Sequence, residues 1–413
     1  MQHQSVAGLR CRVKAFPALS VTAVVARECV RAQDVSGREH GKGLVAEEHA
    51  ELALALLGLL GGVILGFAAR AAHFCTLGAI EEAYYGSERS RLRTWLLAMG
   101  TAVAATQLLD LLGIVDLSAS YRLGSQIPWF GAILGGLLFG FGMALVGTCA
   151  FGMLVRLGGG DLRALVATLV VGIAGYMAMS GVLARLRLEY VDSVRIELPP
   201  LSSSALPALL FGADPVTGQI LVSVIFVALT AGWALSRPRF RQRPGLVAAG
   251  LAIGLVIAGG WAVTSQWGQL QLYPHQPDSY SFVKPIGAAL LWLMTTSGTY
   301  ESFTIGGIFG VPLGALMAAC LKGEVHWEAF DDPREMRRHL IGAAFMGLGG
   351  IMAGGCTIGQ GMTGMAALSV TAFLALGGIV AGALVGIRWL VEGNWPDPCA
   401  MARHIRNLFP PRS

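Results

Sequence analysis

Long apolar stretches recur along the chain from residue 52 onward, and short polar segments separate them. Nine of these stretches approach the length of about 20 residues that a helix needs to cross a bilayer. They lie at residues 52–69, 95–115, 128–146, 164–184, 219–235, 246–266, 303–321, 340–354 and 367–390. The pattern predicts an all-α polytopic membrane protein with about nine transmembrane helices.

Four shorter apolar segments lie between these stretches, at residues 75–85, 149–160, 285–297 and 358–364. Apolar runs of about 10–14 residues are typical of re-entrant or core helices rather than of membrane spans. We therefore predict four short re-entrant helices in addition to the spans.

The two ends of the chain differ from its centre. Residues 1–48 mix charged and polar side chains with one modest apolar run that contains Pro17, which is typical of a disordered extension. Residues 393–413 are expected to form a cytoplasmic tail. Between them we expect one transporter domain built from two half-repeats, residues 50–235 and 246–392.

The composition supports a membrane protein and argues against a soluble enzyme. Charged residues make up 13% of the chain, whereas soluble domains contain about 25%. The 56 glycines fall within the apolar stretches, where glycine lets helices approach closely or break within the bilayer. The chain contains no nucleotide-binding P-loop motif, so direct coupling to ATP within this chain is not expected.

The distribution of basic residues predicts the orientation. With the N-terminus outside and nine crossings, most Lys and Arg residues after the first crossing fall in inside loops, including Arg237, Arg239, Arg241 and Arg243. The basic N-terminal extension is the one segment that conflicts with this orientation. The net charge of +5 is thus interpreted as a topology signal and not as a nucleic-acid site. We expect a multi-pass protein of the bacterial inner membrane with a cytoplasmic C-terminus.

An internal repeat links two of the predicted spans at a constant offset of 207 residues. Gly135, Gly140, Gly142, Gly147, Cys149 and Gly152 align with Gly342, Gly347, Gly349, Gly354, Cys356 and Gly359. The copies lie on the third and eighth spans, so they should cross the membrane in opposite directions. This predicts two inverted pseudo-symmetric halves, an arrangement that places a substrate site between them near the midplane. The alternative is a pair of closely packed glycine-rich helices without a site.

Three of the seven cysteines share one local context. Cys149 and Cys356 lie where a span ends and a short helix begins, and Cys75 precedes another short helix. A helix N-terminus carries unpaired N–H groups and favours anions, and a thiol beside it suits a polarizable sulfur ligand. Buried cysteine also serves as an inert core residue, which is the interpretation preferred for Cys320. The remaining cysteines, Cys11, Cys29 and Cys399, lie in the flanks.

The Gly–Cys motifs at residues 140–152 and 347–361, together with Phe74-Cys-Thr-Leu-Gly-Ala-Ile80, resemble the YeeE/YedE sulfur-transport family, whose better-known members take up thiosulfate. The resemblance covers residues 50–392. It implies nine spans with short central helices. It also implies three essential cysteines that pass thiosulfate along by S–H···S contacts, at Cys75, Cys149 and Cys356. A small soluble sulfur carrier of the TusA type is the implied cytoplasmic partner.

Several polar residues accompany these cysteines in the sequence. Oxyanion oxygens could be oriented by Thr76, Thr148, Thr357, Gln360 and Arg70. The second half has no cysteine equivalent to Cys75, because residues 295–303 occupy the corresponding short-helix region. Glu301 in that region lies either on the path or at the outer water boundary.

The function expected from these features is uptake of thiosulfate or a related small sulfur anion, with no enzymatic reaction, cofactor or metal. Membrane lipid and the anion are the expected partners, and nucleic acid is not. Two alternatives stay open. One is a membrane thiol oxidoreductase that uses Cys149 and Cys356, although no C-x-x-C motif supports it. The other is a transporter of a soft metal such as Cu(I).

Overall fold

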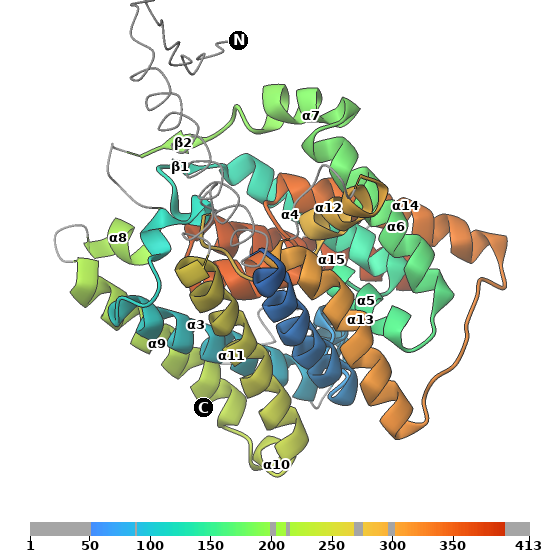
Figure 1. Cartoon of the computed structure of the whole chain (residues 1–413), viewed down its shortest axis with the longest axis horizontal. Coiled ribbons are helices and arrows are strands. Elements are labelled where there is room, and N and C mark those ends of the chain that lie inside the picture. Colours follow the sequence, from blue (N-terminus) through green and yellow to red (C-terminus); the bar gives the residue numbers. More distant parts are fainter. Residues whose placement is uncertain are drawn as a thin grey trace, which may run out of the picture. The chain divides into compact units, whose positions relative to one another are not determined.

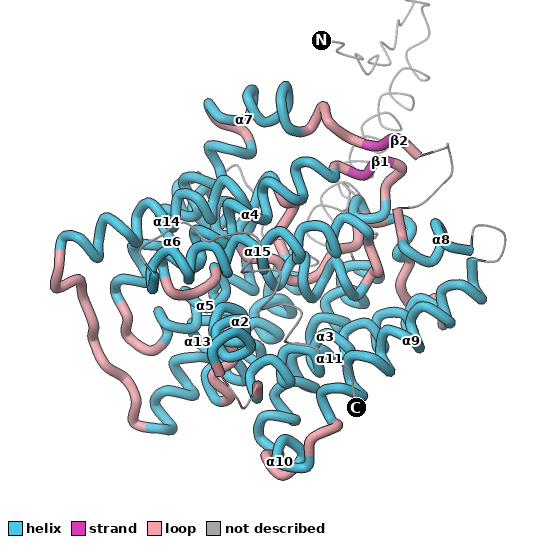
Figure 2. Tube along the Cα trace, turned by 180° about the vertical axis from the view of Figure 1, so that it is seen from behind, coloured by secondary structure: helices cyan, strands magenta, loops and turns pink. Residues whose placement is uncertain are grey.

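The computed structural model describes residues 51–86, 89–198, 204–211, 215–267, 276–295 and 302–392. Helices form most of this part of the chain (Figure 1). Two short strands, β1 (Gln126–Ile127) and β2 (Ile196–Glu197), pair antiparallel (Figure 2). The predicted extension 1–48, the tail 393–413, Glu301 and the flanking cysteines Cys11, Cys29 and Cys399 lie outside the described residues.

Eight helical segments among the described residues are long and apolar enough to cross a membrane, which confirms the all-α polytopic fold. Two of them are composite, because residues 51–71 continue into α2 and α4 continues into α5. The elements that form the eight segments are residues 51–71 with α2 (Thr76–Tyr85), α3 (Ser90–Leu111), α4 (Trp129–Val146) with α5 (Ala150–Gly158), α6 (Leu162–Met179), α9 (Pro215–Leu235), α11 (Pro244–Trp267), α13 (Phe303–Lys322) and α15 (Val370–Glu392).

The ninth expected span, residues 340–354, is the second half of α14 (Pro333–Met352). The first half of this helix carries Arg334, Glu335, Arg337 and Arg338, so its apolar part is shorter than a full span. For this reason the described residues contain eight helices with the length and composition of a span, and α14 is not among them.

All four short segments form helices. Three of them are α2, α5 and α12 (Val283–Met294), and the fourth begins at residue 357 and contains the π-helix η6 (Gly359–Gly364). The start of α12 lies 207 residues after the start of α2, which is the offset of the Gly–Cys repeat. Phe282 is therefore the counterpart of Cys75, and the sequence-based alignment of residues 295–303 with that region was wrong.

Further short helices connect the long ones. They are η1 (Leu117–Ala119), η2 (Tyr121–Leu123), α7 (Val182–Leu186), η3 (Arg187–Val191), α8 (Leu206–Phe211) and α10 (Pro238–Arg241). Of these, η2 and η3 contribute side chains to the site described below.

The two copies of the repeat, α4 and α14, pack against each other in opposite directions. Gly135 contacts the carbonyl group of Gly349, and Gly142 contacts the carbonyl group of Gly342. No Cβ fits at either contact, which explains why the motif needs glycine there. The 207-residue offset relates Gly135 to Gly342 and Gly142 to Gly349, so each contact is the two-fold image of the other. We call these two symmetry-related contacts the exchanged glycine contacts, and they are the geometry expected of an inverted repeat.

The helices α4 and α14, which carry the two copies of the Gly–Cys motif, also each pack against a helix from the other half of the chain. Gly140 in α4 contacts the backbone of Ile379 in α15, and its repeat counterpart Gly347 in α14 contacts the backbone of Val171 in α6. The fully buried Phe139 of α4 has Met346 of α14 as its counterpart, and both have no exposed surface. Helix α4 thus packs against both α14 and α15, and the three are drawn close together in Figures 1 and 2. The hydrophobic core is wider and also contains buried residues of α2, α3, α5, α6, α11 and α13.

Candidate functional site

Cys75, Cys149 and Cys356 each precede a short helix and cap it with the thiol. The sulfur accepts a hydrogen bond from the backbone N–H of the glycine three residues later, which is the usual geometry of a side-chain N-cap. The Sγ–N distances are 3.5 Å for Cys75 and Gly78, 3.4 Å for Cys149 and Gly152, and 3.4 Å for Cys356 and Gly359. The recurring Cys-x-x-Gly spacing is therefore a capping motif.

A left-handed glycine ends the long helix before two of these caps. Gly147 after α4 has φ +80°, and Gly354 after α14 has φ +72°. Only glycine adopts this conformation at little cost, and it lets the chain leave one helix and begin another. The two glycines are repeat counterparts, so the sequence repeat also repeats the helix break that sets each cysteine at a new helix start.

The structure brings the three cysteines of the prediction together. Cys149 and Cys356 are buried, Cys75 is partly exposed, and all three are free thiols. The Sγ of Cys75 lies 3.9 Å from the Oγ1 of Thr148, the residue before Cys149. Cys149 also lies within electrostatic range of the other two thiols. Cys320 is exposed on α13 and does not take part.

The threonines of the prediction lie beside these thiols in different hydrogen-bonding states. Thr76 accepts a hydrogen bond from Trp95 Nε1 at 3.3 Å, and Thr148 contacts Cys75. Thr357 follows Cys356, lies next to Cys149 and has no exposed surface. Its hydroxyl oxygen has no well-formed hydrogen bond to any described residue. A buried hydroxyl without a partner is uncommon and is available to a ligand.

Gln360 and Arg70 are engaged with the protein backbone. The Nε2 atom of Gln360 donates to the carbonyl oxygen of Ala353 at 2.6 Å, which closes the end of α14. Arg70 donates to the carbonyl oxygen of Glu324 at 3.2 Å and forms an ion pair with its carboxylate at 3.6 Å. Gln360 is thus placed to hold the Cys356 loop, and Arg70 holds the loop after α13.

A buried ion pair that sequence reasoning missed lies next to the Cys356 helix. The Nε of Arg122 in η2 donates to the Oδ1 of Asp278 at 2.6 Å, and its NH2 group donates to Oδ2 at 3.2 Å. The NH1 group of Arg122 donates to the carbonyl oxygen of Gly359 at 3.0 Å. Burial alone would lower the pKa of Arg122, but the adjacent Asp278 carboxylate raises it above its usual range. The sequence offered no signal for this pair, since its partners are 156 positions apart.

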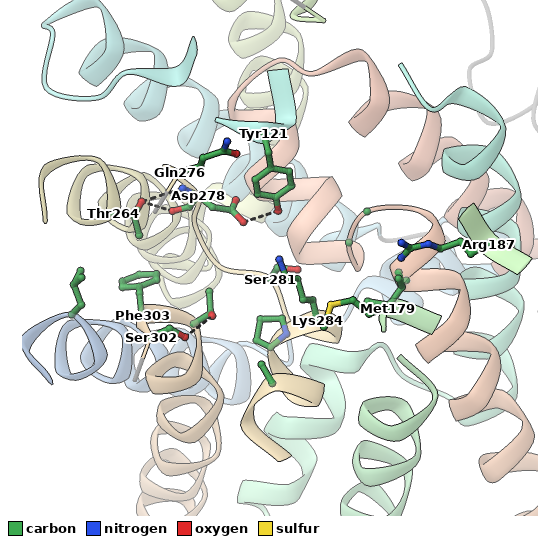
Figure 3. Close-up of a pocket in the computed structure, with 18 residues that line it drawn as sticks. Tyr121, Met179, Arg187, Thr264, Gln276, Asp278, Ser281, Lys284, Ser302 and Phe303 are labelled. Carbon is green, nitrogen blue, oxygen red and sulfur yellow. Dashed lines mark hydrogen bonds between the residues drawn. The ribbon is translucent and has the colours of Figure 1, made fainter. Parts of the chain in front are cut away.

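A cavity of about 570 Å³ extends from this ion pair to the loop before Cys356 (Figure 3). Tyr121, Asp278 and Thr264 lie close together in the figure. Besides Asp278, the charged residues of the lining are Arg187 and Lys284. Gly354 and Gly355, the two residues before Cys356, also line the cavity. The cavity therefore ends at the residue before Cys356, which is itself buried and does not line it.

The described residues do not form a metal site. They contain no group of three or more His, Cys, Asp or Glu side chains arranged to hold an ion. The thiols of Cys149 and Cys356 are not joined by a disulfide. The arrangement offers three capped helix N-termini with free thiols, and one hydroxyl, that of Thr357, without a well-formed hydrogen bond. These groups can form hydrogen bonds to a small anion.

Comparison with known proteins gives the family context of these motifs. A family model described as sulphur transport matches residues 71–385. The chain is 24% identical over 331 residues to the thiosulfate transporter TsuA of Escherichia coli (strain K12), a match that covers 76% of this chain and 88% of that protein. It is 25% identical over 335 residues to the thiosulfate transporter TsuA of Spirochaeta thermophila, with coverage of 76% and 92%.

Proposed function

The chain belongs to the sulphur-transport family, and from this premise we propose that it carries thiosulfate, or a closely related small sulfur anion, across the membrane along the three thiols. It is a multi-pass transport protein for a sulfur-containing anion and not an enzyme. The proposal concerns the identity of the anion and the role of Cys75, Cys149 and Cys356.

The observation that carries the proposal is the hydrogen bonding of the thiols. Each sulfur accepts an amide N–H from its own helix, and this bond does not use the S–H hydrogen, which can donate to a second partner. The terminal sulfur of thiosulfate is a soft acceptor that suits such weak S–H donors. The dianion is further stabilised by the positive ends of the short helices. No covalent bond needs to form or break.

The sequence of contacts follows from the position of each thiol. Cys356 follows the cavity-lining Gly354 and Gly355, Cys149 is buried within electrostatic range of the other two thiols, and Cys75 is partly exposed. Weak successive contacts suit conduction, because tight binding at one site would prevent release. The hydroxyls of Thr148 and Thr357 lie beside this path and would bind the oxyanion oxygens. In the same proposal Thr76 accepts a hydrogen bond from the Trp95 indole at the start of α2, and Gln360 holds the backbone of Ala353.

We further propose the setting in which this path works. The N-terminus lies outside, the C-terminus lies in the cytoplasm, and the protein resides in the bacterial inner membrane, as the basic loops favour. Residues 50–235 and 246–392 are the two half-repeats, which the exchanged glycine contacts of α4 and α14 support. A TusA-like carrier receives the sulfur anion on the cytoplasmic side.

The test is replacement of single cysteines. Cys149→Ala and Cys356→Ala should each abolish uptake of labelled thiosulfate by cells that lack other thiosulfate uptake systems, at unchanged protein levels in the membrane. The matched control is Cys320→Ala, which removes an exposed thiol outside the path and should transport normally. Normal uptake by both Cys149→Ala and Cys356→Ala would exclude the thiol path.

A further inference from the structure

Two packed phenylalanine rings connect the cavity lining with the helix that Cys149 caps. Phe282 is the residue before α12, and it directly follows Ser281, which lines the cavity. Phe151 lies in the first turn of α5, two residues after Cys149. The two ring centres are 5.0 Å apart with an angle of 42° between the ring planes, and both side chains are fully buried. The ring pair therefore extends from the edge of the cavity to the residues around Cys149.

The cavity itself does not reach the buried thiols. It is lined by Gly355 and Ser281, whereas Cys356 and Phe282, the residues that follow them, do not line it and have no exposed surface. The hydroxyl of Ser281 packs against Gly359, whose N–H donates to the sulfur of Cys356. An anion in the cavity therefore cannot contact this thiol unless side chains at the boundary move.

The internal repeat shows that the two halves of the chain differ at this boundary. The 207-residue offset relates Cys75 to Phe282 and Thr148 to Gly355. In the first half the position holds a thiol that is partly exposed and lies 3.9 Å from the hydroxyl of Thr148. In the second half it holds a fully buried ring next to a cavity-lining serine. The path thus has an accessible thiol at one end and an apolar barrier at the other.

We propose that the Phe151–Phe282 ring pair is the gate of the anion path, closed in this structure between the cavity and the thiols of Cys149 and Cys356. This inference rests on the proposed function, because it assigns the barrier on that path. An apolar constriction excludes water, and an aromatic ring offers no hydrogen bond in place of the water that an oxyanion loses. The gate opens when these two side chains move apart, and the long helices keep their positions.

The chemistry of the rings determines which anions pass. The edge of an aromatic ring is positive and makes favourable contacts with sulfur. The terminal sulfur of thiosulfate can therefore enter between the rings first. Sulfate presents only oxygens, which lose their hydrogen bonds to water at an apolar constriction. The ring pair thus favours thiosulfate over sulfate before either anion reaches a thiol.

The first test measures how fast Cys356 reacts with a small anionic methanethiosulfonate reagent in the purified protein, with mass spectrometry to identify each modified cysteine. Phe282→Ala should raise the labelling rate of Cys356 by about tenfold, which corresponds to about 1.4 kcal/mol and is the size of the contribution of an aromatic pair. Phe282→Leu and Phe151→Leu keep apolar volume in case the alanine variant does not fold, and each should raise the rate by at least about twofold.

Two controls separate opening of the gate from general loosening of the protein. The exposed thiol of Cys320 is the internal reference, and its labelling rate should be the same in all variants. Phe226→Ala removes one ring of another aromatic pair, whose centres are 6.0 Å apart. Phe226 lies on α9, which does not line the cavity, so this variant should label Cys356 at the wild-type rate.

The second test compares uptake of labelled thiosulfate and labelled sulfate by cells that lack other uptake systems for both anions. Phe282→Ala should lower the preference for thiosulfate over sulfate by about tenfold, because sulfate no longer has to pass between two rings. The leucine variants should lower it by at least about twofold, and Phe226→Ala should keep the wild-type preference.

Three outcomes would overturn the inference. They are wild-type labelling of Cys356 in the Phe282 and Phe151 variants, an unchanged preference for thiosulfate in the same variants, and an equal rise of labelling in Phe226→Ala. If the ring variants behave as wild type while Cys356→Ala abolishes uptake, the gate is wrong and the thiol path stands. Normal uptake by the cysteine variants would instead remove the proposed function, and the labelling of Cys356 would still decide whether the rings close the cavity.

Discussion

The buried pair Arg122–Asp278 is expected to be strongly coupled energetically. The Arg122 side chain is 3% exposed and that of Asp278 is 20% exposed, so replacing one partner leaves the other charge largely desolvated. Breaking such a pair costs about 3–5 kcal/mol. Arg122→Met and Asp278→Asn should each lower the free energy of unfolding by this amount. The double variant should cost less than the sum, with a coupling energy of about 2–3 kcal/mol.

The assay is equilibrium unfolding of the purified protein in mixed detergent micelles, followed by loss of helical circular dichroism. The exposed pair Arg195–Glu197, whose atoms are 3.6 Å apart, provides the control cycle and should be coupled by about 0–1 kcal/mol. The adjacent Asp278 carboxylate raises the pKa of Arg122, so the stabilisation from its charge is fully present below the pKa of arginine in the unfolded chain, and the coupling should be constant between about pH 6 and 9. Additivity within about 0.5 kcal/mol would refute the reasoning.

Two further variants test the packing and the path. Gly140→Ala should lower the free energy of unfolding by about 1–3 kcal/mol, because a Cβ there collides with the backbone of α15. The control is Gly232→Ala, where a Cβ meets open space, and its free energy of unfolding should be unchanged or higher. Equal unfolding curves for the two variants would contradict this. Thr357→Val should change the free energy of unfolding little, since the hydroxyl has no well-formed hydrogen bond to lose. It should raise the KM for thiosulfate uptake, whereas Thr357→Ser should keep the wild-type KM. Wild-type KM in Thr357→Val would show that the hydroxyl does not contact the substrate.

The helix breaks could be predicted from the sequence because they depend on local residues. A left-handed glycine two positions before each motif cysteine and a glycine amide three positions after it are both contained in Gly-x-Cys-x-x-Gly. The same local reasoning placed all four short helices. It also predicted a ninth membrane span at residues 340–354, but charged residues in the first half of α14 leave an apolar part shorter than a full span.

The contacts between distant segments could not be predicted in this way. Nothing near Arg122 in the sequence indicates that it contacts Asp278 or the carbonyl group of Gly359. The sequence-based prediction placed residues 295–303 opposite the Cys75 region, because the repeat that is visible in the sequence is limited to the Gly–Cys motifs. Only the start of α12 shows that the same offset continues to Phe282. Whether a hydroxyl such as that of Thr357 has a partner likewise depends on packing that no local pattern encodes.

The exchanged glycine contacts between α4 and α14 have a mechanical consequence. Carbonyl groups seated directly on glycine Cα atoms leave no space for one helix to slide along the other. Both helix breaks are therefore fixed to one rigid centre, and the separation of Cys149 and Cys356 should stay constant during a transport cycle. We expect the transported anion, its water molecules and a few side chains to move while α4 and α14 keep their positions. Such a protein would work like a channel and not by alternating access.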